Sequence, residues 1–71
     1  MFAVTILGNL RRRRRLRLIE LARETGIRST NLSTIENRKA AASSRARATL
    51  AGFFGVDEGV IFEPGGLAIE E

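Results

Sequence analysis

The chain contains no cysteine and no histidine in its 71 residues. Without cysteine no disulfide can staple the fold, and without either residue the common zinc sites are excluded. The usual general base and thiol nucleophile of enzymes are missing as well, so we expect no enzymatic activity, no metal and no cofactor. Stability must therefore come from packed apolar side chains, which make up 44% of the residues.

Long hydrophobic runs are also missing. No stretch approaches the roughly 18 apolar residues of a membrane span. The short apolar run at residues 2–7 precedes the arginines, which is the reverse of the order in a secretory signal. We therefore expect a cytoplasmic, nucleoid-associated protein with no membrane partner.

Negative charge is scarce in the first part of the chain, and positive charge is missing from the last part. Residues 1–47 hold twelve basic and three acidic residues, a local charge of +9, whereas residues 48–71 hold five acids and no base, a charge of −5. The first part suits a polyanion such as DNA, and the last part would be repelled by it. Five consecutive arginines, residues 11–15, would point to every side of a helix, so they cannot all meet one ligand.

Apolar spacing predicts one all-α domain with helices near residues 5–14, 18–25, 29–37 and 45–54. Thr5 is a candidate cap for the first helix, and Ser43 or Ser44 for the fourth. Gly26 and Gly55 follow the second and fourth helices, where a left-handed residue would end them. The fourth helix is expected to bury Ala48 with its leucine and phenylalanine, and residues 38–44 to form a loop.

The secondary structure of the C-terminal residues is ambiguous from the sequence. Residues 57–62 could form a short fifth helix capped by Asp57. Alternatively, residues 60–63 and 67–70 flank Pro64, Gly65 and Gly66 and would pair as a β-hairpin. We favour the hairpin, and we divide the chain into a domain of residues 1–59 and a tail of residues 60–71 that forms a dimer contact or simply packs.

Small and apolar residues between positions 18 and 37 have the spacing of a helix-turn-helix. Ala22 is small where two helices would touch, and Gly26 stands where the chain must turn. Leu32 and Ile35 would hold the second of these helices against the core. Its opposite face is polar, and such a helix usually lies in the major groove of DNA.

On these residues, together with Leu10-Arg11, Glu36-Asn37, Leu50-Ala51 and Phe54-Gly55-Val56, the chain resembles the Cro-like, lambda-repressor-like helix-turn-helix family over about residues 7–62. The resemblance implies a compact bundle of four to five helices that binds operator DNA as a two-fold homodimer. It also implies a structural ion pair between Arg11 and Glu36.

The same resemblance implies the contacts with DNA. Base edges would be reached by Arg28, Ser29, Thr30 and Thr34, of which Arg28 alone can grip a guanine with two hydrogen bonds. Phosphates would be contacted by Arg17, Asn31, Asn37, Arg38 and Lys39. The sequence departs from the family at Leu18, where a phosphate-binding glutamine is common, and at Arg38, where glycine is common.

We therefore expect a sequence-specific transcriptional regulator, a repressor, that reads the major groove with residues 29–37. Two alternatives stay open. The first is an antitoxin-type DNA-binding protein whose tail binds a protein partner. The second is a non-specific nucleic-acid binder driven by the arginines, which a steep dependence on salt without a preferred site would reveal.

Overall fold

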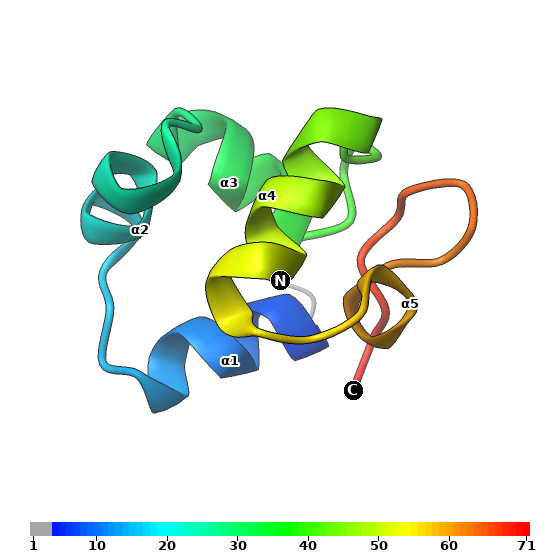
Figure 1. Ribbon diagram of the computed structural model, residues 1–71, viewed down its shortest axis with the longest axis horizontal. Helices are drawn as coiled ribbons and strands as arrows, with labels where there is room; N and C mark the ends of the chain where they lie inside the picture. The colour runs from blue at the N-terminus through cyan, green and yellow to red at the C-terminus, as the bar shows by residue number, and fades with distance from the viewer. Residues whose placement is uncertain (1–3) are drawn as a thin grey trace.

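Helices dominate the computed structural model, which describes residues 4–71 (Figure 1). Within these residues the helices are α1 (Ile6–Arg13), α2 (Leu18–Thr25), α3 (Ser29–Glu36), α4 (Ser44–Phe54) and α5 (Glu58–Ile61). The first four begin and end within one residue of the ranges that apolar spacing predicts. None of the five is long and apolar enough to cross a membrane.

The helix ends have the caps that local chemistry favours. Thr5 Oγ1 accepts a hydrogen bond from Gly8 N at 3.2 Å, and Ser43 Oγ accepts one from Ala46 N at 3.1 Å. Each hydroxyl thereby satisfies an N–H group that has no partner within its helix. Gly26 and Gly55 end α2 and α4 at φ of 75° and 69°, a conformation that costs side-chain-bearing residues more than glycine.

Each helix contributes one fully buried aliphatic side chain to a single core. These residues are Leu7, Leu21, Leu32, Leu50 and Ile61, all 0% exposed. Loops and the tail add Ala42, Phe62 and Ala68 to the same cluster. The expected burial of Ala48 is wrong, because this side chain is exposed, whereas Ala42 in the predicted loop is buried. The short α3–α4 loop must fold inward to bring α4 over the core, and Ala42 fills that point.

The predicted hairpin is also wrong in its first half. Residues 58–61 form α5, and only isolated bridges pair Phe62 with Ala68 and Thr5 with Glu70. A helical turn lets Ile61 reach the core. The turn through residues 63–66 does form, with Gly66 N donating to Glu63 O at 2.8 Å.

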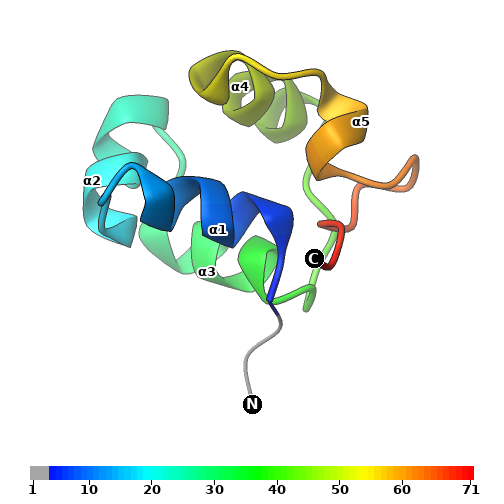
Figure 2. The same cartoon turned by 90° about the horizontal axis from the view of Figure 1, so that it is seen from below.

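The tail packs as part of the domain. Ile6 N donates to Ile69 O at 2.9 Å, and Glu71 N donates to Val4 O at 3.0 Å, so the last residues lie beside the start of α1 (Figure 2). Since Ile61, Phe62 and Ala68 belong to the core, residues 60–71 are not a separable appendage.

A buried clasp joins α1 to the end of α3. Arg11 Nε and Nη2 donate to the Glu36 carboxylate at 2.7 and 3.1 Å, and Arg11 Nη1 donates to Leu16 O at 2.8 Å. Thr5 Oγ1 donates to Glu36 O at 3.0 Å. The ion pair implied by the resemblance is therefore present, and it fixes the position of α3 relative to α1.

Candidate nucleic-acid interface

A three-residue turn joins α2 to α3. Gly26 takes the left-handed conformation, and the chain enters α3 through Ile27 and Arg28. Thr25 fastens the turn because its hydroxyl donates to Leu21 O at 2.8 Å and accepts from Ile27 N at 3.3 Å. The short turn holds the two helices in a defined relation, as the spacing predicts.

The two sides of α3 differ in exposure. Leu32 and Ile35 are 0% and 6% exposed, whereas Thr30 and Asn31 are exposed and Ser29 and Thr34 are half-buried. The prediction that residues 32 and 35 hold α3 while its polar side stays accessible is confirmed by this pattern. The Thr34 hydroxyl donates to Thr30 O at 2.9 Å, which leaves its lone pairs available as acceptors.

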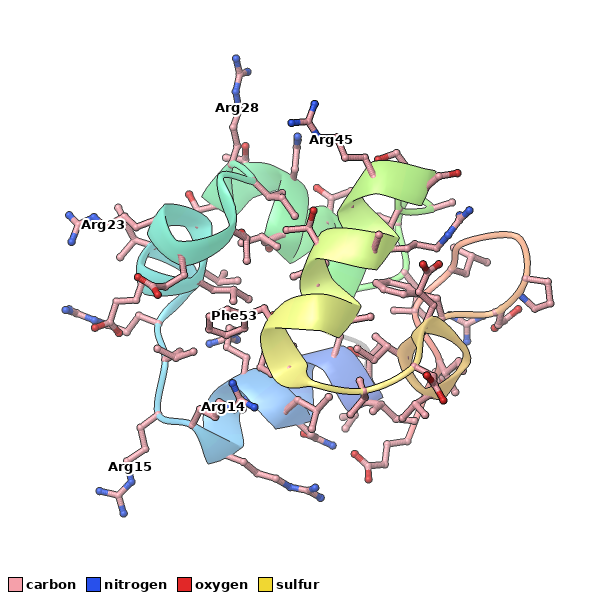
Figure 3. The ribbon with its side chains drawn as sticks, in the orientation of Figure 1. Arg14, Arg15, Arg23, Arg28, Arg45 and Phe53 are labelled. Carbon is pink, nitrogen blue, oxygen red and sulfur yellow. The ribbon has the colours of Figure 1, made fainter. Side chains whose placement is uncertain are left out.

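A hollow of about 650 Å³ lies between the turn, α3, the loop after it and the first half of α4. Asn31, Thr34 and Thr49 are among the polar residues that line it, and Arg28 and Arg45 contribute the charged side chains. Arg28, the N-cap residue of α3, and Arg45 of α4 extend toward the same side of the molecule (Figure 3). This side therefore combines hydrogen-bonding groups with positive charge.

Arg45 is absent from the contacts that the resemblance implies. It lies in the first turn of α4, which contains no acidic residue. A cation there opposes the helix dipole and costs a few tenths of a kcal/mol. In the sequence, the one indication of a binding role for Arg45 is an arginine at an unfavourable position in the first turn of a predicted helix. Only the fold shows that Arg45 and Arg28 line the same hollow.

The basic side chains divide into two groups. Within residues 4–71, ion pairs join Arg11 to Glu36, Arg13 to Glu71, Arg17 to Glu20, Arg38 to Glu63 and Glu70, and Arg47 to Glu58. In the described part of the chain no carboxylate pairs with Arg12, Arg14, Arg15, Arg23, Arg28, Lys39 or Arg45. Three of these unpaired cations, Arg28, Lys39 and Arg45, border α3 or the loop that follows it.

The arginine run disperses as helical geometry predicts. Arg11 is largely buried at 12% exposure. Arg14 donates to the last carbonyls of α4, those of Phe53 and Phe54, at 3.2 Å each, and its guanidinium lies 5.0 Å from the Phe54 ring centroid. Arg15 points to the opposite end of the molecule from Arg28 (Figure 3). The run therefore forms no single basic stripe.

Two of the arginines predicted to contact phosphate are already paired with carboxylates of the protein. Arg17 begins α2, where its Nε lies 3.4 Å from Glu20 Oε1. The pKa of Glu20 is lowered, chiefly because its carboxylate accepts a hydrogen bond from the Arg17 backbone N–H. This carboxylate stands near the position where a phosphate would meet the start of α2, and Leu18 offers no polar group there. Arg38 is paired with two acids of the tail.

The remaining predicted ligands are accessible to different degrees. Lys39 is exposed. Asn37 is half-buried, and its Nδ2 donates to Ser33 O at 2.9 Å, which fixes the side chain against the last turn of α3. Arg38, and not Asn37, takes the left-handed conformation where the family commonly has glycine, with φ of 59°.

The apolar side chains of the tail differ in their exposure. Phe62 and Ala68 are 3% and 0% exposed, and Val60 on α5 is 47% exposed. No group of three potential metal-ligating side chains occurs among the residues that the structure describes.

Comparison of the chain with protein-family models, curated proteins and solved structures found no match.

Proposed function

We propose that the protein binds double-stranded DNA by placing α3 in the major groove, and that it acts as a transcriptional repressor. One observation carries the proposal. The polar side of α3 is accessible while its apolar side is buried, and unpaired cations from the turn, the following loop and α4 border it. A helix held in this way can enter a groove while the flanking cations meet the phosphates.

Hydroxyl groups dominate the side of α3 that would face base edges. Ser29 and Thr30 can donate to or accept from several bases, so each contact discriminates modestly. Arg28 precedes them with an exposed guanidinium, the group suited to paired hydrogen bonds with guanine. Sequence preference is therefore expected to depend on Arg28 most strongly.

Phosphate contacts would come from the edges of this surface. Lys39 is exposed in the loop that follows α3, and Arg45 is exposed and lines the hollow between α3 and α4. The first turn of α3 adds backbone N–H groups, because its N-cap residue Arg28 makes no side-chain cap hydrogen bond. Exposed N–H groups at a helix N-terminus favour anions. These contacts would position the helix without reading the sequence.

Selection of bound sequences from random duplex DNA tests the proposal. Thr30→Ala and Arg28→Ala should change the selected sequence, since lost base contacts cost about 1–3 kcal/mol at the affected base pair. Lys39→Ala should weaken all sequences alike. Arg15→Ala is a matched control, because Arg15 is also exposed and has no ion pair within residues 4–71, but it points to the opposite end of the molecule from Arg28 (Figure 3). Symmetric half-sites about 34 Å apart would show that two copies bind together.

A non-specific binder is the second candidate, and the unpaired Arg15 at the opposite end of the molecule from Arg28 favours it (Figure 3). It predicts equal losses of affinity for Arg28→Ala and Arg15→Ala, a steep salt dependence and no selected sequence. That result would reject the assignment of α3 as the reading helix.

A further inference from the structure

Arg38 differs from the other cations near α3 because two carboxylates hold it. Arg38 lies two residues beyond the end of α3, after the C-cap residue Asn37, in the left-handed conformation with φ of 59°. Its Nη2 donates to Glu63 Oε2 at 3.0 Å, and its Nη1 donates to Glu70 Oε1. The side chain is 26% exposed. Since Arg28, Lys39 and Arg45 have no such pairs within residues 4–71, this arrangement is particular to Arg38.

The two carboxylates are presented by a firmly packed backbone. Glu63 and Glu70 flank the turn at Pro64, and Glu63 N donates to Leu67 O at 2.8 Å. The neighbouring Phe62 and Ala68 are buried in the core. The carboxylates are nevertheless 45% and 63% exposed. They are therefore fixed in position by their backbones and accessible to exchange at their charged ends.

A guanidinium binds carboxylate and phosphate through the same fork of N–H donors. A phosphate that approaches the end of α3 would thus compete with Glu63 and Glu70 for Arg38. Each acid also repels the phosphate directly. Exposed ion pairs are weak enough to exchange, so competition of this kind lowers the affinity without preventing binding.

We propose that Glu63 and Glu70 form an autoinhibitory contact that competes with DNA phosphate for Arg38. The proposal rests on the proposed function, and it gives the acidic tail a part in setting the affinity of that surface. Modification or partner binding that neutralises the two acids would release Arg38 and strengthen binding. The contact is thus a place where affinity can be adjusted without changing any residue that faces a base.

The experiment measures binding of a random-sequence duplex to the full chain at fixed salt. The variant Glu63→Gln/Glu70→Gln removes both competitors. The control Glu24→Gln/Asp57→Asn removes two exposed carboxylates that have no ion pair in residues 4–71, so the net charge of both variants is the same. We expect the test variant to bind roughly three- to tenfold more tightly than the control, from the strength of two exposed pairs.

Arg38→Gln completes the design. In that background the two glutamine substitutions should give a smaller gain over the control change, because only the direct repulsion between the acids and the phosphate is then removed. Equal affinities of the test and control variants, or an undiminished gain without Arg38, would overturn the proposal and leave the proposed function standing. Failure of every variant to bind any duplex would instead reject the proposed function, and the autoinhibitory contact with it.

The single variants Glu63→Gln and Glu70→Gln guard against misfolding of the double variant, which circular dichroism would report. Each should give part of the gain relative to Glu24→Gln. A tail that is merely less stable, with an affinity equal to that of the control, would count against the proposal.

Discussion

Breaking the clasp between Arg11 and Glu36 should destabilise the fold strongly, and Glu36→Gln tests this. The two side chains are 12% and 6% exposed, and two hydrogen bonds join them. Removing one partner of a buried pair costs about 3–5 kcal/mol, because the other charge stays buried without compensation. A chain of this size has only about 4–10 kcal/mol of stability in total. We therefore expect the melting temperature to fall by about 12 °C or more.

Thermal and urea unfolding, followed by circular dichroism, provide the measurement. Glu24→Gln is the matched control, since Glu24 is an exposed acid on α2, and it should change stability by less than about 0.5 kcal/mol. Adding Arg11→Met to Glu36→Gln should recover part of the loss, because no unpaired charge remains. A Glu36→Gln variant within about 1 kcal/mol of the control would refute the reasoning.

Two further predictions concern the backbone and pH. Among three glycine variants, Gly66→Ala should destabilise the fold most, because at φ of +98° its Cβ would lie 2.6 Å from Ala42 O. Gly26→Ala should cost about 1–2 kcal/mol for its positive φ alone, and Gly59→Ala, whose Cβ would lie in open space, should be neutral or stabilising. Urea unfolding measures the three stabilities, and any other order would contradict this account. The pKa of Glu20 is lowered from 4.5 by the N-cap N–H of α2. The ionised carboxylate therefore stabilises the fold fully above the pKa of the unfolded chain, and this stabilisation disappears as pH falls through the lower pKa of the folded chain. Glu20→Gln should therefore reduce the loss of stability between about pH 7 and pH 3, and an unchanged acid dependence would contradict it.

The helices were predictable because their signals are local. Thr5, Ser43, Gly26 and Gly55 mark helix ends through their own hydrogen bonds or φ angles, and the leucines repeat at helical spacing. The conformation of residues 58–61 is not determined by local signals. Val60 and Ile61 favour a strand by propensity, but packing of Ile61 in the core selects a helical turn.

The candidate surface was predictable in its polar face and not in its charges. Thr30 and Asn31 follow from the spacing of the residues around them. Which arginine is neutralised depends on contacts between distant segments, since Arg38 meets Glu63 and Glu70 at separations of 25 and 32 residues. The position of Arg45 beside Arg28 likewise depends on how α4 crosses the molecule. Local spacing does not encode such pairs, and the Arg11–Glu36 pair was predicted only through the family resemblance.

The backbone contacts between residues 4–6 and residues 69–71 have a consequence for how the protein forms. These partners are separated by almost the whole sequence. The chain must therefore lose the entropy of closing a long loop before the hydrogen bonds between them can form and stabilise the fold. Helices α1 to α4 also lack Ile61, Phe62 and Ala68 as core partners until the last segment of the domain has joined them. Folding of a nascent chain stalled before residue 61, where the last core helix ends, should therefore remain incomplete.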